Sequence, residues 1–177
     1  MRRLYRAVGL VLVVIAIAFV YQSLFGGQTV TAHLVSSRAV AAIGSGSDAV
    51  AVADDGSVLL WLPAPKEGSL PRLPLESVPK GGRLQGTALE QVHVLAAAPA
   101  GLRPYVEGSY YGESGVDVNL TNGVELRFGN DTQATRKWKA ATAVLADPSV
   151  TALDYVDLHA PSRPAIGGSG HTLPTAP

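Results

Sequence analysis

The histidines and carboxylates are the side chains of this sequence that could perform metal or acid–base chemistry. Four histidines are present, and no two have the spacing of metal ligands: His33, His93, His159 and His171. The carboxylates of interest are scattered through predicted turns and strands: Asp54, Asp55, Asp117, Glu125, Asp131 and Asp157. There is no cysteine, and no serine lies in a G-x-S-x-G elbow. We therefore expect a protein that is not an enzyme and has no metal or cofactor site.

Two further motifs have simple structural interpretations. Residues 44–49 read GSGSDA, which superficially matches a nucleotide-binding glycine fingerprint. That fingerprint requires a helix after it, whereas a strand-like VAVAD follows here, so we predict a turn. Arg136, Lys137 and Lys139 form a basic cluster on a predicted helix, which we interpret as a solvated face.

The first residues of the chain have the pattern of a membrane anchor. Residues 1–6 carry three arginines and no acid, and residues 7–25 form a nineteen-residue, mainly apolar run. A spanning helix needs about twenty such residues, and the basic flank predicts a cytoplasmic N-terminus. Residues 26–37 then form a short juxtamembrane segment. The alternative is a cleaved signal peptide with Val30-Thr31-Ala32 as its cleavage site, although that site lies far beyond the apolar run.

The rest of the chain has the size and composition of one domain outside the cytoplasm. Without the three N-terminal arginines it has 11 basic and 14 acidic side chains, which gives no electrostatic footprint for nucleic acid. We expect one α+β domain over residues 38–168, a mostly antiparallel β-sheet with two packed helices, and a disordered tail over residues 169–177.

Alternating apolar residues predict the strands. The alternation on either side of Asn122-Gly123 predicts a β-hairpin with a tight primed turn. Further strands are expected at residues 38–43, 49–53, 57–62, 105–111, 153–158 and 163–167. Residues 63–83 contain five prolines and are expected to be extended and held to the core by leucines.

Capping residues and apolar stripes predict two helices. Thr87 and Glu90 have the spacing of a capping box, which starts a helix that runs to Ala98. Asn130 or Asp131 is expected to cap a second helix that extends to Ala146. The buried stripe of the second helix is predicted to be Ala134, Trp138, Ala141 and Leu145.

Residues 119–168 resemble the end of the bacterial cell division family FtsQ, also called DivIB. The hairpin VNLTNGVELRFG ends in a glycine, a helix with a lysine in its first half follows, and then come YVDL and a segment that ends in PAIG. The resemblance extends more loosely upstream to about Arg38. It implies an FtsQ/DivIB β domain that follows a single transmembrane helix, in the bacterial inner membrane at the division septum. The POTRA domain that such proteins carry after the anchor is expected to be missing, because only residues 26–37 precede the β domain.

The resemblance also implies a role as a scaffold that recruits partners. In this family the C-terminal strand accepts a strand from FtsB, which acts with FtsL, and an edge strand is suited to such pairing. The residues expected at this contact are Tyr155, Asp157, His159, Ser162, Ala165 and Ile166. Two nearby prolines, Pro161 and Pro164, would blunt the edge if they faced the partner.

A second hypothesis is an anchored or secreted extracytoplasmic module that binds a small molecule, a lipid or a cell-wall component. Residues 28–35 are similar to the opening of the lipid-transporting MCE domains. This hypothesis predicts a concave, largely apolar pocket.

Overall fold

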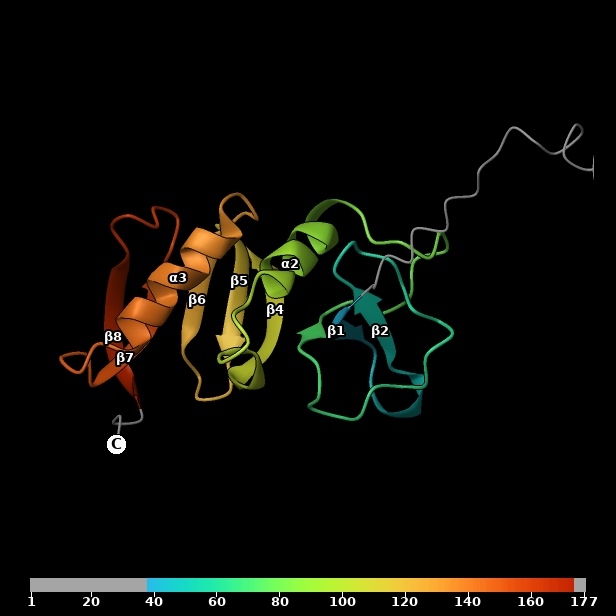
Figure 1. Cartoon of the computed structure of the whole chain (residues 1–177), viewed down its shortest axis with the longest axis horizontal. Coiled ribbons are helices and arrows are strands. Elements are labelled where there is room, and N and C mark those ends of the chain that lie inside the picture. The colour runs from blue at the N-terminus through green and yellow to red at the C-terminus, as the bar shows by residue number, and fades with distance from the viewer. Residues whose placement is uncertain (1–37, 174–177) are drawn as a thin grey trace, which may run out of the picture. The chain divides into compact units, whose positions relative to one another are not determined.

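The computed structural model describes residues 38–173 (Figure 1). The predicted anchor, residues 7–25, lies outside the described residues, as do residues 174–177. Among residues 38–173, no helix is both long and apolar enough to cross a membrane. The described part corresponds to the predicted extracytoplasmic domain and includes the first residues of the predicted tail.

One sheet of eight strands organises the described residues, in the order β2-β1-β3-β4-β5-β6-β7-β8 (Figure 1). The strands are β1 (Ala39–Ile43), β2 (Val50–Ala53), β3 (Arg72–Leu73), β4 (Val106–Gly112), β5 (Gly115–Leu120), β6 (Glu125–Gly129), β7 (Ala152–Asp157) and β8 (Ala165–Thr172). The pairs β1–β2, β4–β5, β5–β6 and β7–β8 are antiparallel, and the pairs β1–β3, β3–β4 and β6–β7 are parallel. The predicted mostly antiparallel sheet is therefore confirmed.

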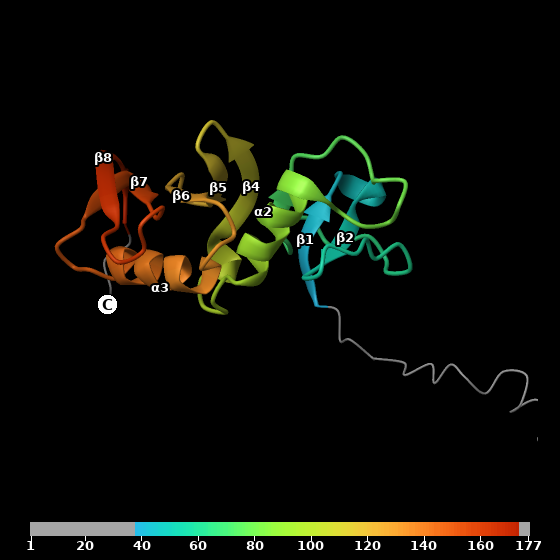
Figure 2. The same ribbon diagram turned by 90° about the horizontal axis from the view of Figure 1, so that it is seen from above.

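Two α-helices of the described part, α2 (Gly86–Ala96) and α3 (Ala134–Leu145), cover one face of this sheet (Figure 2). Helix α2 connects β3 to β4, and helix α3 connects β6 to β7. Both connections join parallel neighbours, which need a crossover of this kind. The 3₁₀ turns η1 (Gly46–Asp48) and η2 (Arg103–Tyr105) lie in other connections. The turn η1 occupies the GSGSDA motif, so the prediction of a turn there is confirmed.

The core lies between the helices and the apolar face of the sheet. Alternate residues of β5 and β6 are at most 3% exposed: Val116, Val118, Leu120, Leu126 and Phe128. Trp138 of α3 is 1% exposed and packs on Phe128 with ring centroids 5.0 Å apart. Its indole Nε1 donates a hydrogen bond to the carbonyl of Val94 on α2 at 2.7 Å. The predicted stripe of α3 is confirmed at Ala134, Trp138 and Ala141, which are all buried.

The hairpin between β5 and β6 is present, but its turn differs from the prediction. Gly123 has a φ of 90°, whereas Asn122 is not in the positive-φ region, so the turn is not the tight primed type. The N–H of Leu120 donates to the carbonyl of Val124, and the N–H of Gly123 donates to the carbonyl of Leu120, both at 2.9 Å. Glycine therefore provides the left-handed residue of a three-residue loop.

The predicted helix caps are wrong. Helix α2 begins at Gly86 after Gln85, and no side chain caps it, so the capping box of Thr87 and Glu90 does not form. Helix α3 begins at Ala134 after Gln133, which has a φ of 58°. The predicted cap Asp131 instead lies 2.6 Å from Nδ1 of His93 on α2. The contact with His93 of α2 thus engages the side chain of Asp131, which the local sequence spacing predicted to cap α3.

The interpretation of the basic cluster on α3 as a solvated face is wrong for one of its three residues. Lys137 is only 4% exposed. Its Nζ donates to the carbonyl of Phe128 at 2.7 Å and to the carbonyl and Oδ1 of Asn130 at 3.1 and 3.0 Å. The ammonium thus satisfies backbone acceptors at the end of β6, where the chain turns toward α3.

Two predictions at the ends of the domain also need correction. Residues 57–62 do not form a strand. Ser57 and Val58 each make an isolated bridge, and the chain turns after Leu59. Residues 169–172 are not part of a disordered tail, because β8 continues to Thr172. Their glycines predicted disorder, but pairing with β7, which includes Leu153 opposite His171, fixes them in the sheet.

Candidate functional site

The last strand, β8, forms one edge of the sheet (Figure 1). The opposite edge, β2, is covered by the chain that follows it. Val58 bridges Val52, and the N–H of Leu59 donates to the carbonyl of Ala51 at 2.8 Å. Within residues 38–173, no strand pairs with the outer side of β8. This edge is therefore the place where the described domain can accept another strand.

The two prolines near this edge lie outside β8. Pro161 and Pro164 belong to the turn between β7 and β8, which the N–H of Arg163 closes by donating to the carbonyl of Ala160 at 2.9 Å. The strand begins after them, at Ala165. Proline therefore removes no backbone donor from β8.

The hydrogen-bond pattern of β7 shows which of its amides point to β8. The N–H of Leu158 donates to the carbonyl of Arg127 at 2.9 Å and thus points to β6. Backbone N–H groups alternate in direction along a strand. The N–H groups of Asp157 and Tyr155 consequently point to β8.

The same alternation defines the free backbone groups of β8. Ala165 lies opposite Asp157, and Gly167 lies opposite Tyr155. In an antiparallel ladder, pairs that exchange two hydrogen bonds alternate with pairs that exchange none. Ile166, which lies between these two pairs, therefore turns its N–H and C=O toward the outside. Its side chain is 48% exposed.

A glycine-rich bulge interrupts β8 beyond this point. The register with β7 shifts between Leu153 and Tyr155. The Asp154 carboxylate occupies the bulge and accepts the N–H of Gly170 at 2.6 Å. A Cβ atom at Gly168, where φ is 78°, would overlap this carboxylate. This bulge was not predicted from the sequence, although the closely spaced glycines in the segment opposite Asp154 indicate it.

The residues predicted to contact a partner lie on three adjacent segments. Tyr155 and Asp157 are on β7, one strand inside the edge. His159 and Ser162 are exposed residues of the turn, and Ala165 and Ile166 are exposed residues of β8. All six residues thus lie at the β7–β8 end of the sheet, with Ala165 and Ile166 on the edge strand itself. Ile166 pairs with the buried Val156 and lies on the helix side of the sheet, whereas Tyr155, Asp157 and Ala165 lie on the other side.

His159 is engaged within the domain. Its Nδ1 lies 2.8 Å from the carboxylate of Asp157, and its backbone N–H donates to the same oxygen at 2.9 Å. Its Nε2 lies 3.2 Å from the carbonyl of Ser114 in the β4–β5 turn. Burial raises the pKa of Asp157, but the bonds from His159 outweigh this effect and hold that pKa below its ordinary value. The pair fixes the entrance to the β7–β8 turn.

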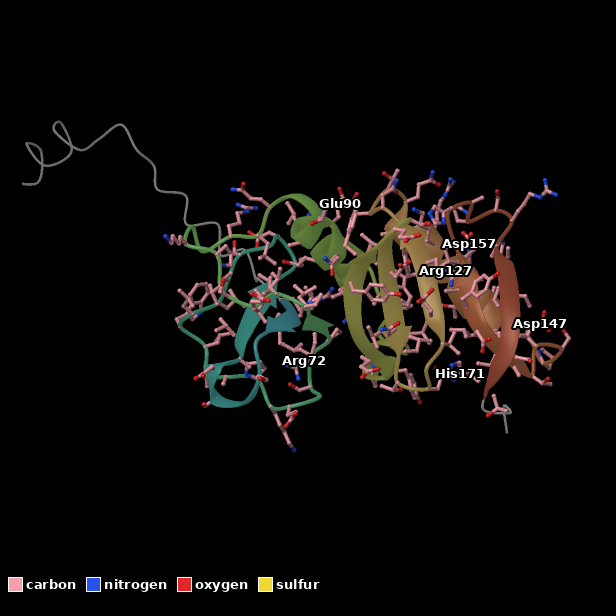
Figure 3. The ribbon with its side chains drawn as sticks, turned by 180° about the vertical axis from the view of Figure 1, so that it is seen from behind. Arg72, Glu90, Arg127, Asp147, Asp157 and His171 are labelled. Carbon is pink, nitrogen blue, oxygen red and sulfur yellow. The ribbon has the colours of Figure 1, made fainter. Side chains whose placement is uncertain are left out.

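The face of the sheet that the helices leave uncovered carries a polar cluster next to this edge (Figure 3). Glu125 accepts hydrogen bonds from the Tyr110 hydroxyl and from Nε of Arg127. The guanidinium of Arg127 also lies 3.9 Å from the centre of the Tyr155 ring, a cation–π contact. A Cβ at Gly167 would overlap Tyr155, so the aromatic ring reaches from the cluster to the edge strand.

Asp117, on the same face, is a buried carboxylate with incomplete hydrogen bonding. It is 6% exposed, and its Oδ1 has no hydrogen-bond partner among the described residues. Burial, with repulsion from Glu125, raises the pKa of Asp117 to about 6.

Among the described residues, His, Asp and Glu side chains form no group that could hold a metal ion.

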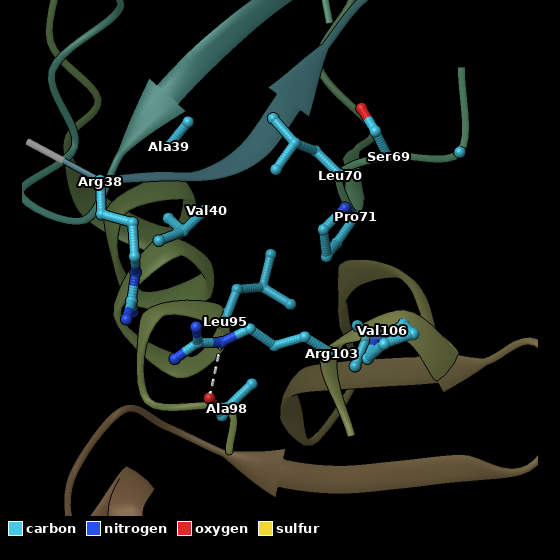
Figure 4. Close-up of a pocket in the computed structure, with 12 residues that line it drawn as sticks. Arg38, Ala39, Val40, Ser69, Leu70, Pro71, Leu95, Ala98, Arg103 and Val106 are labelled. Atoms are coloured by element: carbon cyan, nitrogen blue, oxygen red, sulfur yellow. Dashed lines mark hydrogen bonds between the residues drawn. The ribbon is translucent and has the colours of Figure 1, made fainter. Parts of the chain in front are cut away.

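A pocket of about 350 Å³ lies at the other end of the domain, between β1, the end of α2 and the start of β4 (Figure 4). Its charged lining residues are Arg38 and Arg103. They donate hydrogen bonds to the carbonyls of Ala96 and Ala98 at 2.7 and 2.9 Å, near the C-terminus of α2. Both arginines are therefore already bound to backbone carbonyls of the domain. Their presence in the pocket does not support the second hypothesis, a site for a small molecule.

Within residues 38–173 the fold is thus a mixed sheet with two crossover helices and an unpaired C-terminal edge strand. A family model described as cell division protein FtsQ/DivIB, C-terminal, matches residues 41–159. The chain belongs to this family.

The other comparisons add little to this assignment. The major extracytoplasmic domain of the cell division protein DivIB from Geobacillus stearothermophilus, as its trans isomer, is 18% identical. The match covers 50% of this chain and 75% of that one, with a TM-score of 0.35. A search of curated proteins found no match.

Proposed function

We propose that this domain recruits other division proteins by adding one of their strands to β8. Membership of the FtsQ/DivIB family implies a role in cell division. The observation that carries the proposal is the free backbone of Ile166 on an edge that no proline blocks. Strand addition supplies main-chain hydrogen bonds, and side chains beside the edge supply specificity. FtsB-like and FtsL-like proteins are the partners that we propose.

The bulge in β8 limits how this edge can be used. A regular ladder is available only near Ala165–Gly167, because the Asp154 bulge follows, and such bulges weaken edge pairing. The added strand therefore needs further contacts, which we assign to Ser162 in the turn and to Tyr155 and Asp157 beside the edge. His159 acts by holding the turn in place.

We further propose that the domain works outside the cytoplasm, on a single-pass anchor formed by residues 7–25, and that it is non-catalytic. The basic flank and the apolar run support this topology. In this arrangement the domain reaches the extracytoplasmic parts of its partners at the division septum.

The experiment that tests the proposal is capture of FtsB-like and FtsL-like proteins from the same organism by the full chain. Ile166→Pro removes the outward N–H but no bond to β7, so the fold should survive and capture should be lost. Ile166→Ala is the matched control, because it retains the N–H and should retain capture. Undiminished capture by Ile166→Pro, with unchanged thermal unfolding, would contradict strand addition. Deletion of residues 162–168 should likewise abolish capture.

A further inference from the structure

Three consecutive large apolar side chains are exposed at the β2 end of the domain. Leu60, Trp61 and Leu62 are 65%, 73% and 44% exposed. Single exposed apolar residues are ordinary on protein surfaces, but contiguous apolar patches mark sites of interaction with proteins or membranes. The patch is independent of β8, which lies at the opposite edge of the sheet (Figure 1).

The fold holds this tip in its exposed position. Leu59, the residue before it, is 1% exposed and packs with Ala51 and Ala53 of β2. The N–H of Leu62 donates to the carbonyl of Leu59 at 3.1 Å, which closes a turn around Leu60 and Trp61. The base of the turn is therefore fixed to the sheet, and its apolar tip is presented to the outside.

The segment that carries the tip has an excess of basic side chains, although the domain as a whole is acidic. Residues 57–83 contain four basic and two acidic side chains, whereas residues 38–173 as a whole contain 11 basic and 14 acidic ones. Lys66 and Lys80 are both exposed. This charge distribution favours an anionic surface next to the tip.

The length of the connector limits how far Arg38, which precedes β1, can lie from a bilayer. Twelve residues, 26–37, separate the predicted spanning segment from Arg38. Such a connector spans at most about 40 Å when fully extended. Tryptophan prefers the membrane–water interface, where its ring is in apolar surroundings and its N–H remains hydrated.

We propose that Leu60, Trp61 and Leu62 insert into the interfacial layer of the bilayer that holds the anchor, with Lys66 and Lys80 near anionic headgroups. The tip forms a second, reversible membrane contact. It restricts the rotation of the domain on its connector and leaves the β8 edge at the far end of the sheet.

The test uses the full chain reconstituted in vesicles of phosphatidylglycerol and acyl-brominated phosphatidylcholine. The chain has two tryptophans, and Trp138 is buried at 1% exposure. The difference in emission between the natural chain and Trp61→Phe therefore reports Trp61. This emission should be quenched by the brominated lipid and protected from iodide in the water. Emission that iodide quenches and brominated lipid does not would overturn the proposal.

The matched control places the reporter at the other edge. Ile166→Trp in the Trp61→Phe background should be quenched by iodide and not by brominated lipid. Equal lipid quenching at both positions would overturn the inference, because the domain would then lie on the bilayer without a specific tip. A chain that fails to stay with the vesicles would overturn it as well. Quenching of Trp61 should weaken when phosphatidylglycerol is omitted, and its persistence at full strength would overturn the role given to the lysines.

Discussion

At the scale of single residues, two buried charged side chains of this domain differ in how completely they are hydrogen-bonded. Lys137 and Asp117 are the charged side chains buried within the described residues. The ammonium of Lys137 has three oxygen acceptors, whereas one carboxylate oxygen of Asp117 has no partner there. A buried charge is tolerated when its hydrogen bonds are complete and is costly when they are not. The two residues should therefore respond to neutralisation in opposite directions.

Lys137→Met should destabilise the domain. Methionine keeps the length of the stem, but the carbonyls of Phe128 and Asn130 lose the hydrogen bonds from the ammonium, and the carbonyl of Phe128 retains only the N–H of Asn130. Loss of hydrogen bonds to a charged donor should lower the free energy of unfolding by about 1.5–3 kcal/mol, measurable by urea denaturation. Lys139→Met, at an exposed position of the same helix, should change stability by less than about 0.5 kcal/mol. Equal effects of the two substitutions would show that Lys137 is not a buried donor.

Asp117→Asn should stabilise the domain at neutral pH and not at pH 4. The folded-state pKa of Asp117, about 6, is above its ordinary value of 3.8, so the folded domain prefers the protonated carboxyl. The cost of the charge is absent below about pH 4, grows as the pH rises through this window and is complete above about pH 6. A shift of this size corresponds to about 2–3 kcal/mol. The stability difference between variant and natural chain, measured from pH 4 to pH 8, should rise accordingly. A difference independent of pH would exclude titration of Asp117 as its source.

At the scale of elements, α3 fixes the helical layer to the sheet through one side chain. Trp138 contacts Phe128 of β6 and donates to Val94 of α2, so it joins three elements. Trp138→Ala should lower the free energy of unfolding by about 3–5 kcal/mol. Trp138→Phe keeps a ring and loses the hydrogen bond, so its cost should be smaller. A melting temperature unchanged by Trp138→Ala would mean that the core does not depend on this contact.

The interiors of these elements were predictable from the sequence, and their ends were not. Alternation over β5 and β6 and the stripe of α3 follow from the burial of one face, which sequence spacing records directly. Helix starts and buried donors depend on tertiary partners. Asp131 contacts His93 and Lys137 reaches the end of β6, and neither contact is visible in local spacing.

The candidate site was predictable to the same extent. Its location at the end of the sheet followed from resemblance, and the clustering of the six proposed contact residues depended on the β7–β8 turn. The bulge at Asp154 was missed because glycines in a C-terminal segment also indicate disorder. Only the register of β8 shows that these glycines accommodate a carboxylate.

At the scale of the whole molecule, the two ends of the sheet have different surfaces. The β2 edge is covered by its own chain and presents Leu60, Trp61 and Leu62, whereas the β8 edge presents free backbone groups. This separation is consistent with a domain that contacts the bilayer at one end and a partner strand at the other. The proposed membrane contact requires that residues 7–25 hold the chain in the membrane.

The topology is therefore the last prediction. Three arginines before a nineteen-residue apolar run predict a retained anchor with its C-terminus outside the cytoplasm. A reporter that is active only outside the cytoplasm, fused after Pro177, should be active, and the fusion should sediment with membranes. Replacing Arg2, Arg3 and Arg6 by glutamate should reduce this activity, because the positive charge that orients the span is lost. A soluble product that begins near His33 would instead identify the apolar run as a cleaved signal peptide and would remove the basis for the membrane contact of Trp61.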